Sequence, residues 1–193
     1  NLKDSKYVVE VTVTNTGNLA GKEAVQLYLQ KPYTEGGIEK ASVELVDFGK
    51  TPMLEPGASA VITMEVDGRD LASYDAYGER GYVVDEGTYY LTVAKDAHAA
   101  VNNILAAKGK TTQNSDAMDA DGDTDMVYSE ELSKDVETYK TSVATGNVVT
   151  NQFDNADLNL YEGSETDVEY ISRSDWEGTV KYGLNEDNTR TYD

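Results

Sequence analysis

The sequence predicts a mainly β protein, a β-sandwich followed by a helical and irregular C-terminal extension. Apolar and polar residues alternate from Tyr7 to Thr14, which is the period of a half-buried strand. Short segments of the same kind recur along the first half of the chain, separated by Gly, Pro and Asn turn signals. After about residue 96 this pattern is replaced by helical spacing. We therefore expect a sandwich over residues 1–96 and an extension over residues 97–193.

Turn residues mark where the strands of the sandwich end. Asn15 to Asn18 end the first strand, Pro56-Gly57 precede the fourth, and Asp85-Glu86-Gly87 separate the last two. The expected strands cover residues 7–13, 23–29, 43–48, 60–66, 82–84 and 88–93.

The extension begins with a predicted helix over residues 96–108. Val101, Ile104 and Leu105 lie on one side of it, and Gly109 follows its end. The polar stretch 110–125 is expected to form a loop.

A second helix is expected from about Ser129 to Gly146, because the apolar residues there follow helical spacing. These residues are Leu132, Val136, Tyr139 and Val143. A short strand is expected at 168–172, and a loosely held polar tail at 182–193.

Composition excludes several classes of function. The chain has 36 acidic and 16 basic residues, a formal net charge of −20, which repels nucleic acid and anionic membrane surfaces. We therefore expect no nucleic-acid partner and no membrane partner. The absence of cysteine excludes disulfides, thiolate catalysis and cysteine-bound metals.

The first half carries a series of short motifs in a fixed order. They are VTVTNTG at 11–17, AGKEAVQLY at 20–28, ELVDF at 44–48, LEPG at 54–57, DLASYD at 70–75 and EGTYYLTV at 86–93. In this order and spacing they resemble the fibronectin type III-like domain of glycoside hydrolase family 3 enzymes, the β-glucosidase group. The resemblance implies a fibronectin III-like or immunoglobulin-like sandwich that is an accessory domain of a larger enzyme.

The second half is similar to a subset of that family with rearranged domain order. The segments that carry the similarity are AVNNILAAKG at 100–109, TNQFDNAD at 150–157 and YISRSDWEGT at 170–179. In that subset the sandwich lies between an α/β sandwich domain and a catalytic barrel. The resemblance implies that residues 97–193 lead toward a missing barrel, that the partners are the other domains of the parent chain, and that this chain alone has no enzyme activity.

Ser174-Asp175-Trp176 is the one motif that points to catalysis. The family's nucleophile is an aspartate in a similar context, at the end of a barrel strand. Such a glycosidase needs two carboxylates held across the sugar, and this chain is too short for the eight βα units of a barrel. We therefore interpret the triplet as a structural segment and assign no catalytic residue.

The acidic loop Asp119–Asp125 is the best candidate for a metal site. Alternating carboxylates around a glycine suit calcium. Gly122 precedes the third aspartate, whereas an EF-hand places glycine after it, so the pattern differs. The alternative is a solvated acidic loop, and we assign no metal ligand and no cofactor.

The remaining candidates have simple structural explanations. His98 is the only histidine and cannot build a histidine-rich metal site. Gly36-Gly37 make a flexible loop without phosphate-binding spacing. The 14 tyrosines could stack on sugar rings, so carbohydrate is the alternative partner and a carbohydrate-binding module the alternative function. Strand propensity explains most of them, including Tyr7, Tyr28, Tyr89 and Tyr90.

Overall fold

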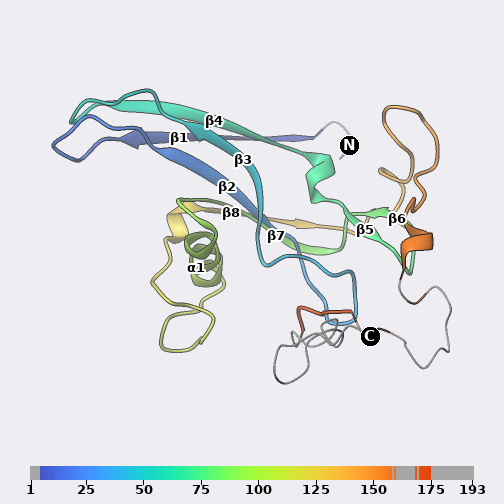
Figure 1. Ribbon diagram of the computed structural model, residues 1–193. Coiled ribbons are helices and arrows are strands. Elements are labelled where there is room, and N and C mark those ends of the chain that lie inside the picture. Colours follow the sequence, from blue (N-terminus) through green and yellow to red (C-terminus); the bar gives the residue numbers. More distant parts are fainter. Residues whose placement is uncertain (1–4, 158, 160–167, 169, 175–193) are drawn as a thin grey trace, which may run out of the picture.

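The computed structural model describes residues 5–157, 159, 168 and 170–174 (Figure 1). Its β-strands are β1 (Lys6–Thr14), β2 (Ala24–Gln30), β3 (Glu44–Lys50), β4 (Ser59–Asp67), β5 (Ser73–Asp75), β6 (Gly81–Val83), β7 (Gly87–Ala94) and β8 (Val127–Leu132). The described α-helix is α1 (Ala97–Ala107), and the 3-10 turns are η2 (Gly68–Leu71), η3 (Thr124–Met126) and η4 (Asp154–Ala156).

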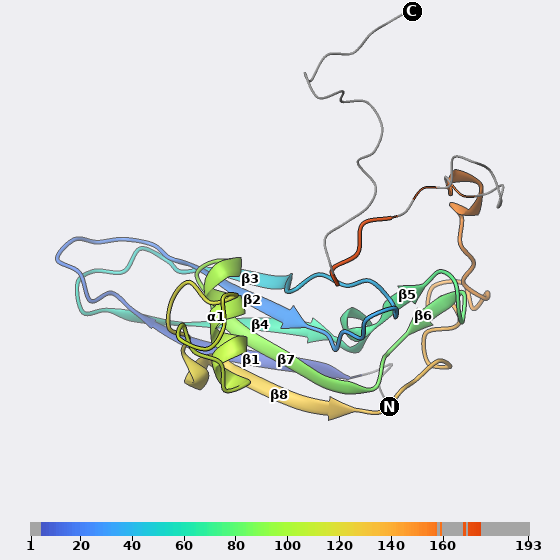
Figure 2. The same cartoon turned by 90° about the horizontal axis from the view of Figure 1, so that it is seen from below.

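These strands form the predicted β-sandwich. One layer is the antiparallel pair β1-β4, and the other is the sheet β3-β2-β7-β8. Figures 1 and 2 show α1 on the outer side of the larger sheet, so that the order of layers is β1/β4, larger sheet, helix. The small hairpin β5-β6 stands at the end of the sandwich opposite the β1–β2 turn.

The core lies between the two sheets. Its buried side chains come from β2, β4 and β7, and include Leu27, Leu29, Met64, Val66 and Leu91. The alternation in β1 places Tyr7, Val9, Val11 and Val13 against this core, as the sequence predicts.

Gly49 allows β3 to approach β4 closely. A Cβ atom at this position would lie 2.3 Å from Cγ2 of Ile62, so glycine is needed for the contact. A register shift between Leu27 and Tyr28 lets β3 bulge beside β2.

Helix α1 confirms the helix predicted over residues 96–108. The Asp96 side chain accepts a hydrogen bond from Ala99 N (2.8 Å) at its start, and Gly109 (φ 76°) follows its end. Ala100 and Ile104 are fully buried, and Asn103 Nδ2 donates to Thr92 Oγ1 of β7 (3.2 Å). The helix therefore covers the outer face of the larger sheet.

The helix predicted from Ser129 to Gly146 is wrong. Residues 127–132 form β8, which pairs along the edge of β7 with Tyr90 opposite Ser129. Beyond β8, Asp135 and Val84 exchange two backbone hydrogen bonds, in which each N–H donates to the carbonyl oxygen of the other residue (2.9 Å each). Tyr139 joins the core from the turn that follows at 5% exposure. Leu132 and Tyr139 thus reach the core without a helix, because the free edge of β7 pairs with β8, whereas Val143 is exposed.

Two shorter segments also differ from the prediction. Residues 168 and 170–172 are described and do not form the strand predicted at 168–172. Strand β5 was not predicted, because the three residues Ser73–Asp75 are too few to show a period of two. The predicted tail at 182–193 lies outside the described residues. No helix in the described part of the chain is both long and apolar enough to cross a membrane.

Candidate functional site

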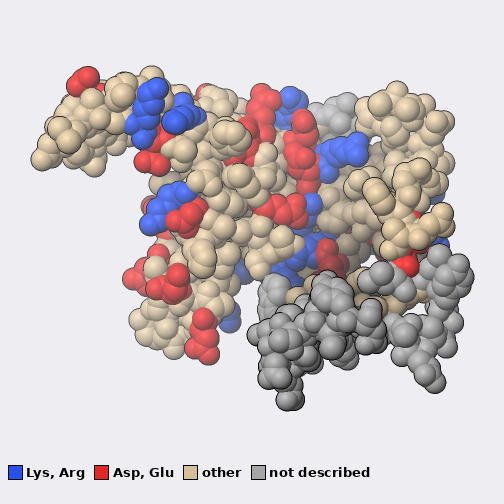
Figure 3. All heavy atoms as spheres, in the orientation of Figure 1, with Lys and Arg blue, Asp and Glu red and all other residues tan. Residues whose placement is uncertain are grey.

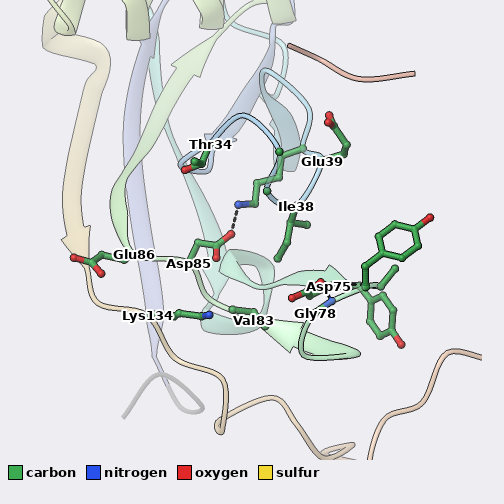
Figure 4. Close-up of a pocket in the computed structure, with 15 residues that line it drawn as sticks. Thr34, Ile38, Glu39, Asp75, Gly78, Val83, Asp85, Glu86 and Lys134 are labelled. Carbon is green, nitrogen blue, oxygen red and sulfur yellow. Dashed lines mark hydrogen bonds and ion pairs between the residues drawn. The ribbon is translucent and has the colours of Figure 1, made fainter. Parts of the chain in front are cut away.

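A hollow of about 620 Å³ lies at the end of the sandwich that carries the β5-β6 hairpin (Figure 4). Its walls come from the β2–β3 loop, from β5-β6 with its turn, and from the β6–β7 turn. The lining residues include Thr34, Ile38, Glu39, Lys40, Tyr74, Asp75, Tyr77, Asp85, Glu86 and Lys134.

Two buried lysines fix the base of the β2–β3 loop. Lys40 donates to the carbonyl oxygen of Pro32 (2.8 Å) and forms an ion pair with Asp85, which Figure 4 shows pointing toward it. Lys31 donates to the carbonyl oxygen of Ala72 (2.9 Å) and lies 3.2 Å from a carboxylate oxygen of Glu44. Buried ammonium groups need such partners, so both lysines fix the loop in place.

Asp75 organises the turn of the β5-β6 hairpin. Its carboxylate accepts hydrogen bonds from the backbone N–H groups of Gly78 (2.8 Å), Glu79 (2.9 Å) and Tyr77 (3.2 Å). Burial alone raises the pKa of Asp75, but these donors outweigh it and the pKa is lowered overall. The carboxylate is therefore held ionised as a structural acceptor.

The far side of the hairpin is tied to the C-terminal segment. Arg80 forms an ion pair with Asp154 of η4 (2.6 Å), and Glu79 lies 3.6 Å from Lys134. The walls of the hollow are thus connected to residues far along the chain.

Three carboxylates that line the hollow, those of Glu39, Asp75 and Asp85, hold loops in place. Glu39 accepts from the backbone N–H of Arg173 and from the Ser172 hydroxyl, and these bonds lower its pKa. Asp85 is paired with Lys40, and Asp75 caps a turn. A glycosidase's general acid needs a raised pKa, so the lowered pKa values of Glu39 and Asp75 suit structural roles.

The acidic loop Asp119–Asp125 is docked on α1. Asp119 accepts a hydrogen bond from Asn102 Nδ2 (2.7 Å), and Asp123 N donates to Asn103 Oδ1 (2.8 Å). A Cβ atom on Gly122 would lie 2.1 Å from the carbonyl oxygen of Asn102, so glycine lets the loop touch the helix backbone. Within the described residues, no three His, Cys, Asp or Glu side chains are grouped as a metal ion requires. The calcium hypothesis gains no support from this arrangement.

The other candidates are spread over the molecule. His98 is largely exposed near the start of α1, 3.6 Å from Asp119. Gly36 has a φ of 73° within the β2–β3 loop, and Gly37 N donates to Thr34 O (2.9 Å). Ser174 is exposed, whereas Asp175 and Trp176 lie outside the described residues.

The four tyrosines predicted in strands are used structurally. Three of them donate a hydrogen bond from the hydroxyl, Tyr7 to Glu130, Tyr28 to Gln26 and Tyr89 to the Asp85 carbonyl oxygen. The ring of Tyr90 lies under the Lys108 ammonium group. Among the described residues, the most exposed aromatic side chains are far apart in the sequence: Phe48 on β3, Tyr77 in the β5–β6 turn, Tyr128 on β8 and Phe153 just before η4. Of these, Tyr77 lines the hollow.

Charged side chains of both signs are interspersed on the surface. On the face in Figure 3, basic side chains lie beside acidic ones over the strands. On this face the described charges are therefore mixed and do not form a patch of one sign.

Sequence reasoning missed the anchors of the hollow. The spacing of Asp75 and Gly78 is a turn signal that could have indicated the cap. No local pattern links Lys40 to Asp85 or Arg80 to Asp154, because these pairs join distant segments.

The sandwich is similar to known proteins over part of the chain. Residues 23–97 match the family described as fibronectin type III-like domain. The chain is 39% identical over 101 residues to a β-glucosidase of Ruminococcus albus, covering 50% of this chain and 10% of that protein. It is 38% identical over 86 residues to β-glucosidase A of Butyrivibrio fibrisolvens, covering 43% and 10%.

One solved structure is also similar over part of the chain. A β-glucosidase from Paenibacillus barengoltzii aligns with a TM-score of 0.46 and 38% identity, covering 49% of this chain and 11% of that one. The chain spans about a tenth of the length of the curated relatives it matches.

Proposed function

We propose that this chain, which contains a fibronectin type III-like domain homologous to a region of β-glucosidases, is a non-catalytic accessory module of a glycoside hydrolase. Its role is to brace the catalytic domains of the parent chain. The observation that carries this proposal is that Glu39, Asp75 and Asp85 around the hollow hold loops in fixed positions.

A pair of exposed apolar side chains offers a surface for a neighbouring domain. Leu45 and Phe48 on β3 are 52% and 67% exposed. Leu45 lies opposite Tyr28 of β2, and Phe48 lies opposite Gln26. Residues two apart on a strand share a face, so the bulge in β3 places Leu45 and Phe48 together on the outer face of the sheet. Exposed apolar residues of this kind favour protein contacts.

We also propose that residues 97–193 form the extension that leads toward a catalytic barrel. In this proposal the extension first contributes β8 and Tyr139 to the sandwich and then contacts the β2–β3 loop at Ser172 and Arg173. The low apolar content of the chain supports a segment that is ordered by what it covers.

The bracing role is tested by comparing Phe48→Lys with Val61→Lys in the longer parent chain. Val61 is 60% exposed on β4 in the other sheet, so it is a matched control. We expect Phe48→Lys to lower the thermal midpoint and activity of the parent while both variants leave the isolated chain unchanged. Equal behaviour of the two variants in the parent would contradict an interface on β3.

An activity assay tests the non-catalytic assignment. The isolated chain is expected to release no aryl group from an aryl β-glucoside. Saturable turnover that disappears in Asp175→Asn would instead make Ser174-Asp175-Trp176 a nucleophile motif.

Sugar binding is the second candidate function. Tyr74 and Tyr77 line the hollow, and Tyr77 is 78% exposed, so a ring is accessible for stacking. Fluorescence titration with cello- and laminari-oligosaccharides, reported by Trp176 and the tyrosines, tests it. Saturable binding that is lost in Tyr77→Ala would establish a carbohydrate-binding module, and a flat response would leave the accessory role.

A further inference from the structure

The β2–β3 loop makes a specific contact with residues more than 130 positions away. Glu39 Oε1 accepts a hydrogen bond from the Ser172 hydroxyl (2.7 Å), and Glu39 Oε2 accepts one from Arg173 N (3.0 Å). One carboxylate thus binds both a side chain and the backbone of the same short segment.

The Arg173 side chain adds two further contacts. Its guanidinium lies 4.8 Å from the centre of the Tyr33 ring, and one of its nitrogens donates to the carbonyl oxygen of Ala41 (3.2 Å). A planar guanidinium can stack on an aromatic ring and at the same time donate hydrogen bonds from its edge. An ammonium group cannot do both in the same way. The contacts therefore favour arginine at this position.

The loop that carries the receiving surface is anchored by the buried Lys40 side chain. Lys40 binds the Pro32 carbonyl and Asp85 at the base of the loop, and its side chain is 3% exposed. The Tyr33 hydroxyl also donates a hydrogen bond to Glu39 Oε1 (3.3 Å). Because the loop is fixed by its own buried anchors, its conformation does not depend on the arriving segment.

Ser172 also contacts Ser174 within the docked segment. Ser174 N donates to Ser172 Oγ (3.1 Å), and the two hydroxyls are 2.8 Å apart. Arg173 and Ser174 therefore form a turn against the loop.

We propose that Tyr33, Glu39 and Ala41 form a docking site for Ser172-Arg173, an exit contact that holds this segment on the β2–β3 loop. The occupant is this chain's own arginine-bearing segment. The inference does not rest on the accessory role, because every contact lies within this chain. It assigns a function to the β2–β3 loop that neither its glycines nor its length indicates.

Limited trypsin digestion of the 193-residue chain tests the exit contact, because Arg173 is itself a cleavage point. Cleavage after the exposed Lys110 serves as the internal reference. We expect the Arg173–Ser174 bond to be cleaved more slowly than the bond after Lys110. In Glu39→Ala, cleavage after Arg173 should accelerate about tenfold, because it follows the population of the undocked segment.

Glu35→Ala is the matched control, since it removes the same charge from an exposed position of the same loop. It should leave both cleavage rates unchanged. The proposal is overturned if Arg173 is cut as fast as Lys110 in the natural chain, or if Glu39→Ala and Glu35→Ala behave alike. An equal acceleration at both bonds in Glu39→Ala would also overturn it, because that result reports general unfolding.

Amide hydrogen exchange gives a second measurement on the folded chain. The Arg173 N–H donates to Glu39, so its exchange should be slowed in the natural chain and in Glu35→Ala. Fast exchange of this amide in the natural chain would refute the exit contact even if the digestion rates were inconclusive.

Discussion

Lys40 and Asp85 form an ion pair that joins the β2–β3 loop to the turn before β7. The Lys40 side chain is 3% exposed and that of Asp85 is 26% exposed, so the pair lies largely away from water. Replacing Asp85 by Asn leaves a buried ammonium without its counter-charge. We expect a loss of about 2–3 kcal/mol in the free energy of unfolding, somewhat below the full penalty for a deeply buried pair. Urea denaturation measures it.

The surface pair Lys6–Glu65 is the control for this prediction. Both side chains are more than half exposed at a separation of 2.8 Å. Because water screens such a pair, Glu65→Gln should leave the urea midpoint unchanged. Similar losses in Asp85→Asn and Glu65→Gln would show that burial of the first pair has no energetic consequence.

The pKa of Asp75 predicts a pH dependence of stability. Because this pKa is lower in the folded chain than the unfolded value of about 3.9, the stabilisation is fully present above that value. It is lost as the pH falls through the lower folded-state pKa. Asp75→Asn should therefore be less stable than the natural chain by about 1 kcal/mol at neutral pH, and the difference should shrink below about pH 4.

This difference is measured from urea midpoints between about pH 2.5 and about pH 7, taken in steps of about half a pH unit. Asp116→Asn removes an exposed carboxylate and should give no pH-dependent difference. A constant difference for Asp75→Asn across the whole range would show that its carboxylate is not preferentially ionised in the folded chain.

Gly122 predicts a steric effect on the acidic loop. The contact of 2.1 Å that a Cβ would make with the Asn102 carbonyl is with backbone, which cannot rotate away. Gly122→Ala should push the loop off α1 and lower the free energy of unfolding by about 1–3 kcal/mol. Gly21→Ala meets no atom within 4 Å and should be nearly neutral. Equal thermal midpoints for the two variants would contradict the docking of this loop.

The place of β8 in the larger sheet predicts the result of shortening the chain. A chain of residues 1–96 lacks β8 and the buried side chains of Ile104 and Tyr139. Each such side chain contributes about 1.5–3 kcal/mol when fully buried, so this chain should be markedly less stable than residues 1–157. Urea midpoints and binding of an apolar dye compare the two. Identical midpoints would support a sandwich that is complete at residue 96.

The sequence predicted most of the sandwich because its information there is local. Alternation in β1 and β4 and turn residues such as Pro56-Gly57 locate strands without knowledge of their partners. The helical spacing of Val101, Ile104 and Leu105 and the glycine at 109 likewise mark α1. The fibronectin type III-like resemblance, confirmed by the match over residues 23–97, rests on the same local motifs.

The failures involve residues whose structure depends on distant partners. Val127–Leu132 is a strand because β7 offers an open edge, which helical spacing of Leu132, Val136 and Tyr139 cannot reveal. The hollow depends on Lys40 with Asp85 and on Arg80 with Asp154, and the exit contact depends on Glu39 with Arg173. Tertiary geometry alone brings these pairs together.

The position of β8 also has a consequence during synthesis on the ribosome. Strand β7 is complete at Ala94, but its partner β8 begins only at Val127, after α1 and the acidic loop. Until that later segment emerges, the backbone N–H and C=O groups along one edge of β7 have no strand to pair with. At about 5–20 residues per second this interval lasts a few seconds, during which the nascent sandwich presents an edge to other nascent chains.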